Sequence, residues 1–154
     1  MDPVEGATLV LAGVTVISTY FSLRERRVAA HTERLNALYA LVGEWQMNAA
    51  LIVDNADMLN AMQPFAHDSV PAALPYLPTL PPLVADAVKA ALQIVTLRNS
   101  TLALFPLKAS DISGVRDAAI TLHNEQAGEF KRLLEEGAKG LEHYLKEEKR
   151  KFII

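Results

Sequence analysis

The sequence contains no cysteine among its 154 residues. That absence excludes a disulfide framework, a thiolate zinc site and a cysteine nucleophile. The sequence also lacks a glycine-rich phosphate loop, a dinucleotide-binding glycine cluster and the serine elbow of hydrolases. Its net charge of -3 at pH 7 provides no basic field that would attract nucleic acid. We therefore expect no nucleic-acid partner.

Metal and catalytic spacings are absent as well. A metal site on a helix needs histidines four residues apart, or a Glu-x-x-His sequence. Neither spacing occurs around the four histidines, which are His31, His67, His123 and His143. Asp54 and Asp57 lie three residues apart, which is the usual pattern of a solvated helix face. We expect no catalytic residue, no metal and no cofactor, and hence a protein that is not an enzyme.

The composition indicates a folded chain. Hydrophobic residues make up 51% of the sequence and charged residues 21%. These fractions exclude an intrinsically disordered chain and a protein with many membrane spans. A chain of this length suits one domain with a sizeable core, or a smaller domain with an anchor.

One uncharged stretch, from Ala7 to Leu23, spans 17 residues near the start of the chain. A spanning helix needs about 20 apolar residues, and about 17 is the lower end of that range. Residues 1–23 are therefore predicted to form a transmembrane anchor. Two alternatives stay open, namely a buried helix of a bundle and a secretory signal. The acidic start of the chain and the lack of a cleavage site disfavour the signal.

Charges on either side of this stretch predict an orientation. Asp2 and Glu5 precede it, and Arg24, Arg26 and Arg27 follow it. The positive-inside rule then places the N-terminus outside and the rest of the chain in the cytoplasm, as in a bacterial inner membrane. A stripe of small residues with 4-3-4-3 spacing is predicted to pack on a membrane partner, either a second copy or a larger protein. The stripe consists of Thr8, Ala12, Thr15, Thr19 and Ser22.

A long helix is predicted over residues 24–63, because no proline lies between Pro3 and Pro64. Apolar residues recur in it at the 3-4 spacing of a heptad repeat, which is typical of a helix that packs on other helices. We expect these positions to form the bundle core: Leu35, Leu38, Val42, Trp45, Ile52 and Leu59.

The second half of the chain is predicted to be a proline-rich loop and a helical hairpin. Residues 64–82 form the loop, whose stretch from Pro75 to Pro82 is expected to be extended. The loop either packs along its own bundle or docks on a partner. Residues 83–154 form the hairpin, with helices at about 82–104 and 111–149 separated by Pro106. Gly137 lies close to an apolar stripe, where it allows close helix approach.

These features together predict an all-α protein, with a single transmembrane helix that continues into a three-helix antiparallel bundle. Its predicted role is that of a non-enzymatic, membrane-anchored accessory or scaffold subunit of a larger complex. The expected partners are the lipid bilayer and either a membrane protein or a second copy of the chain. Two other roles remain open: a membrane-linked signalling module, and a soluble interaction bundle whose first helix packs on a partner.

Overall fold

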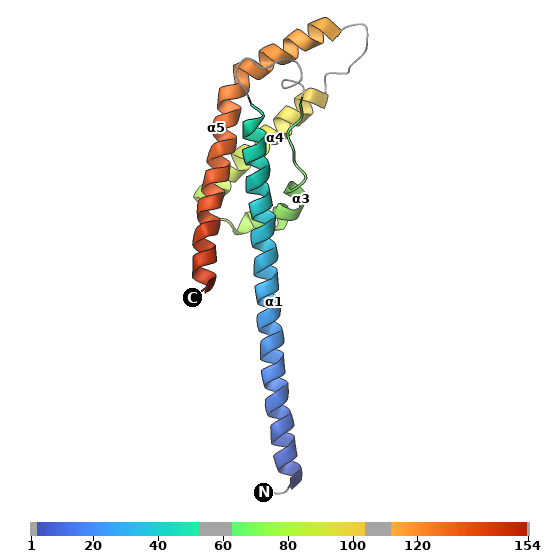
Figure 1. Ribbon diagram of the computed structural model, residues 1–154, viewed down its shortest axis with the longest axis vertical. Coiled ribbons are helices and arrows are strands. Elements are labelled where there is room, and N and C mark those ends of the chain that lie inside the picture. Colours follow the sequence, from blue (N-terminus) through green and yellow to red (C-terminus); the bar gives the residue numbers. More distant parts are fainter. Residues whose placement is uncertain (1–2, 53–62, 104–111, 154) are drawn as a thin grey trace. The chain divides into compact units, whose positions relative to one another are not determined.

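The computed structural model describes residues 3–52, 63–103 and 112–153 (Figure 1). Side chains are described in these ranges except at residues 3–10, 12, 112, 113, 115, 116, 119, 152 and 153. The described residues are all helical or irregular, and they form a helical bundle with no strand. The helices are α1 (Pro3–Ala50), α3 (Val70–Ala73), α4 (Pro82–Ala103) and α5 (Ile112–Ile153), with a 3-10 helix, η1 (Leu74–Thr79).

The chain divides into two structural units, Met1–Asn36 and Ala37–Ile154. Helix α1 contributes to both units, because it runs for 48 residues without a break. The second unit contains the end of α1 together with α3, η1, α4 and α5. Every completely buried side chain among the described ones lies in this unit.

The predicted membrane anchor is wrong. No helix in the described part of the chain is long and apolar enough to cross a bilayer. The physical reason lies in the composition of the uncharged stretch, which has only 17 residues, five of them serine or threonine. The outside N-terminus and cytoplasmic bundle inferred from Arg24, Arg26 and Arg27 depend on that span, so this prediction of the localisation is wrong as well.

Helix α1 ends at Ala50, whereas the sequence pattern predicts a helix that continues to residue 63. The amide N–H of Leu51 still donates to Met47 O at 3.1 Å, and that of Ile52 donates to Ala49 O at 3.2 Å. The second bond spans three residues, so the helix tightens as it ends. Residues 53–62 lie outside the described residues.

Four of the six residues predicted to form the core are buried in the structure. The side chains of Leu38 and Trp45 are completely buried, and those of Val42 and Ile52 are almost so. Leu35 is half-buried, and Leu59 lies outside the described residues. Helices α4 and α5 also supply completely buried side chains, among them Ala91, Leu134, Leu141 and Leu145. The heptad pattern therefore identifies the buried face of α1 in the second unit.

Residues of α1, α4 and α5 meet at Gly137. A Cβ atom built on Gly137 would lie 2.7 Å from Ala91 Cβ and 3.1 Å from Trp45 Cζ3. It would also lie 3.2 Å from the backbone oxygen of Ala87. Only a residue without a side chain fits this space, so the role predicted for Gly137 is confirmed.

The proline-rich segment is helical rather than extended between Val70 and Thr79, which corrects the prediction of a polyproline conformation. A proline φ near −65° suits a 3-10 helix as well as an extended chain. The Thr79 hydroxyl donates to Tyr76 O at 2.6 Å and closes the last turn. Only at Leu80 does the backbone become extended, with φ −75° and ψ 147°.

Polar side chains of α1 and α4 fasten the start of this segment to the bundle. The Asn48 amide forms two hydrogen bonds of 2.8 Å with the backbone N–H and C=O of Ala66. The Asn99 amide does the same with Phe65, at 2.8 and 2.9 Å. We call this the asparagine clamp. Phe65, Ala73 and Leu80 are buried, so these parts of the segment pack on their own bundle, which was the first of the two alternatives.

Candidate helix-docking surface

The first unit exposes large apolar side chains along α1. Among the described residues, seven large apolar side chains between residues 11 and 23 are each at least 51% exposed: Leu11, Val14, Val16, Ile17, Tyr20, Phe21 and Leu23. Val28 follows at 42%. The exposed large apolar residues elsewhere, which are Met47, Leu74, Leu83 and Leu97, are scattered singly. Single exposed apolar residues are common, but a group of this size marks an interaction surface.

Four of these side chains continue the heptad spacing of the bundle core towards the N-terminus. Val14, Ile17, Phe21 and Val28 stand at positions 3, 4 and 7 residues apart, and we call them the docking seam. Arg24 occupies the heptad position between Phe21 and Val28. In the second unit, residues with this spacing pack on neighbouring helices. In the first unit they are exposed, so they have the pattern of a packed helix without the packing.

Two hollows lie between the side chains of this surface. One has a volume of about 460 Å³ and is lined by Phe21, Arg24, Glu25, Val28 and Ala29. The other, of about 310 Å³, is lined by Tyr20, Leu23, Arg24 and Arg27. Each contains side chains at positions i, i+3, i+4 and i+7. Four residues so spaced form the hole that receives a side chain of a second helix in knobs-into-holes packing.

The small residues predicted to pack on a membrane partner lie on another side of α1, where the described hydroxyl groups already have hydrogen-bond acceptors. Thr15 and Thr19 donate their hydroxyl hydrogens to the carbonyl oxygens of Leu11 and Thr15, each at 2.8 Å. Those hydroxyls are satisfied one turn back within α1 and need no partner. Ser22 is exposed, and the side chains of Thr8 and Ala12 lie outside the described ones. Nothing in the described residues brings the predicted small stripe against another helix.

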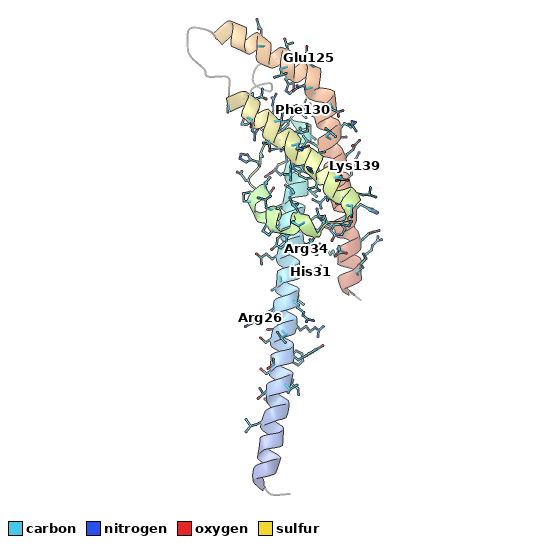
Figure 2. All side chains as sticks on the ribbon, turned by 180° about the vertical axis from the view of Figure 1, so that it is seen from behind. Arg26, His31, Arg34, Glu125, Phe130 and Lys139 are labelled. Atoms are coloured by element: carbon cyan, nitrogen blue, oxygen red, sulfur yellow. The ribbon has the colours of Figure 1, made fainter. Side chains whose placement is uncertain are left out.

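Positive charge follows the apolar side chains. Arg24, Arg26 and Arg27 are all exposed, and Glu25 is the single acidic residue among them. Figure 2 shows Arg26 and, further along α1, His31 and Arg34. The sequence pattern predicts that these arginines set an orientation in a membrane, and this prediction is wrong because no described helix can span one. They instead give the docking surface a basic end, which would favour acidic groups in a partner.

The asparagine clamp is a structural feature that the sequence pattern does not predict. Asn48 is completely buried, and Glu44 beside it on α1 accepts a 2.8 Å hydrogen bond from the amide N–H of Ser69. The Arg98 guanidinium lies 5.6 Å from the centre of the Phe65 ring. Burial lowers the pKa of Arg98 from its ordinary value. The one signal in the sequence is an asparagine three residues after Trp45, on the apolar side of a helix.

The histidines do not form a site. His123 is buried, His31 is half-buried, and His67 and His143 are exposed. His67 lies 3.4 Å from the Asn99 amide nitrogen, measured to its Nδ1 atom. In the described part of the chain, no three histidine, aspartate or glutamate side chains are grouped so as to hold a metal ion.

A functional conclusion about this protein has to rest on its own residues. No protein-family model, curated protein or solved structure matches this chain.

Proposed function

We propose that the protein is a non-enzymatic interaction module whose first helix packs on a helix of a protein partner. The observation that carries this proposal is the group of seven large apolar side chains between residues 11 and 23, each at least half exposed. Exposing this apolar surface to water is unfavourable in free energy, and packing on a second helix would remove it from water. The proposal needs no cofactor and no metal.

The bundle supports this role as a folded support for the docking helix. Residues 37–50 of α1 pack with α4 and α5 in a three-helix arrangement, and α1 continues without a break into the docking seam. A helix held by packing at one end loses less conformational freedom when its other part binds. Because the bundle holds one end of α1, the proposed role is that of an accessory or scaffold protein with a prearranged docking helix.

Site-specific photocrosslinking in the expressing cell tests the proposal. A photoreactive phenylalanine derivative replaces Ile17 or Phe21, and the matched control carries it at His143 on α5, whose side chain is 79% exposed. We expect one protein adduct of discrete mass at each docking position and none at the control. The adduct at position 21 should disappear when Ile17→Ser is added, because a serine hydroxyl cannot fill an apolar interface. Equal labelling at all three positions would refute the proposal.

A further inference from the structure

Two arginines of the first unit line the hollows of the docking surface. Arg24 lines both hollows, and Arg27 lines the smaller one together with Tyr20 and Leu23. Both arginine side chains are exposed. They stand three residues apart, so they are neighbours on the helix surface, where two like charges repel each other. None of the four side chains that line the smaller hollow is a carboxylate.

Helix α1 has no acidic residue at the positions that could pair with these arginines. Side chains pair along a helix at spacings of three and four residues. Apart from the two arginines themselves, the residues at those spacings are Tyr20, Phe21, Leu23, Val28, Ala30 and His31. Glu25 lies one residue from Arg24 and two from Arg27, and side chains at these spacings do not face each other. The positive charge of the smaller hollow is therefore not neutralised along its own helix.

An arginine on α5 has the carboxylate neighbours that Arg24 and Arg27 lack. Arg132 pairs with Glu129 at 2.7 Å and with Glu136 at 2.8 Å, at spacings of three and four residues. The Arg132 side chain is 52% exposed, so exposure alone does not prevent such pairs. Within the described part of the chain, Arg24 and Arg27 form no ion pair. They are available to a carboxylate of another molecule.

Packing of a helix over the docking seam would also cover Arg24. This residue holds the heptad position between Phe21 and Val28, so a helix that covers those two side chains lies over Arg24 as well. Covering a charge without a partner is costly, because the charge loses its hydration. A purely apolar helix would gain at Phe21 and Val28 and lose at Arg24. A parallel second copy in register would lose more, since it would bring a second Arg24 to the same place.

From these observations we propose that the partner is a different protein, whose facing helix combines an apolar stripe with an acidic edge. The stripe covers the docking seam, and a carboxylate of the edge binds Arg24 and Arg27. Guanidinium groups suit this role because they can hold a carboxylate through two parallel N–H···O bonds. Charges at the edges of paired helices determine which partner is chosen. This inference rests on the proposed function, because it names the chemistry of the partner of the same surface.

Two synthetic peptides test the charge preference of the full-length chain. Both are helices of three heptads with leucine at the a and d positions, and they carry either glutamate or lysine at the e and g positions. Fluorescence anisotropy measures binding at 0.15 M salt, where the Debye length is about 8 Å. We expect the acidic peptide to bind at least tenfold more tightly, or about 1.4 kcal/mol. The net charge of -3 favours the basic peptide, so this preference can come only from local groups.

Charge-reversed variants assign the preference to the two arginines. Arg24→Glu together with Arg27→Glu should reverse it, and tighter binding of the basic peptide would also show that this variant remains folded. The matched control is Arg150→Glu on α5, which makes the same charge change at an exposed residue and should keep the preference for the acidic peptide. Equal binding of the two peptides, binding of neither, or a preference that survives the double change would overturn the proposal.

The cellular crosslink separates this inference from the proposed function. The protein adduct formed at position 21 should differ in mass from twice 16.8 kDa, and its yield should fall at least tenfold when Arg24→Glu is added. An adduct of twice the chain mass, or one unaffected by Arg24→Glu, overturns the acidic partner and leaves the interaction module standing. The absence of a protein adduct at positions 17 and 21, or crosslinking to lipid alone, overturns both.

Discussion

A methyl group added at Gly137 would enter a close contact between side chains and backbone of α1, α4 and α5. In Gly137→Ala the new Cβ atom would lie 2.7 Å from Ala91 Cβ, well inside van der Waals distance. Ala91 Cβ is bonded directly to the backbone, so it cannot rotate away. Helix α4 or α5 must move instead, and Trp45 Cζ3, 3.1 Å from the new atom, limits that movement.

The magnitude follows from two opposing terms. Overpacking of a close-packed core costs about 1–3 kcal/mol. Replacing glycine by alanine within a helix returns about 1 kcal/mol through helix propensity. We therefore expect Gly137→Ala to lower the free energy of unfolding by about 1 kcal/mol, and by up to about 2 kcal/mol where the helices cannot adjust.

Gly128→Ala is the matched control, because Gly128 lies on the same helix and nothing stands within 4 Å of its Cβ position. This variant keeps only the favourable term and should gain about 0.5–1 kcal/mol. Thermal unfolding followed by circular dichroism should separate the two variants by roughly 4–8 °C, for a difference of about 2 kcal/mol.

Adding Ala91→Gly to Gly137→Ala removes the 2.7 Å contact and tests its cause. The double variant should be more stable than the two single effects predict, by at least about 0.5 kcal/mol. If Gly137→Ala gained as much stability as Gly128→Ala, or if the two changes simply added, the close approach would not be what requires glycine at this position.

Three further predictions concern the bundle. Asn48→Ala leaves the N–H and C=O of Ala66 without their partner and should cost about 2–4 kcal/mol, measured by urea unfolding. Trp45, the only tryptophan and completely buried, should shift its emission to longer wavelength on unfolding, and Trp45→Ala should cost about 3–5 kcal/mol. The hydrogen bond from Arg132 lowers the pKa of Glu129, so Arg132→Ala should raise that pKa in an NMR titration. A lowered pKa of Glu129 stabilises the folded state above the ordinary carboxyl pKa, and this contribution is lost as pH falls through the folded-state pKa. Because the side chains of Glu129 and Arg132 are both exposed, the contribution is small, and Arg132→Ala should leave the unfolding midpoint at pH 7 unchanged within error.

The sequence predicts the features that depend on local periodicity. The 3-4 spacing identifies Leu38, Val42, Trp45 and Ile52 as buried, since a helical stripe of apolar residues must pack on something. Proline and its neighbours predict the start of α4 at Pro82, because proline suits the first turn of a helix. The membership of the core and the bounds of α4 can thus be read from residues near in sequence.

The features that the sequence does not predict depend on distant contacts. Asn48 is bonded to Ala66, 18 residues away, and Asn99 to Phe65, 34 residues away. No spacing rule links an amide side chain to a backbone group so remote, so the clamp is not visible in the sequence. The docking seam is partly visible, because its apolar residues are evident, but hydropathy alone does not distinguish a helix that packs on protein from one that enters lipid.

The asparagine clamp also has a consequence for how this chain can change over evolutionary time. Asn48 and Asn99 recognise main-chain atoms, which every residue type except proline provides in full. The side chain at position 66 is therefore largely free to drift, whereas the two asparagines are not. Sequence divergence in the proline-rich segment would leave its attachment intact, so long as no new proline replaces Phe65 or Ala66.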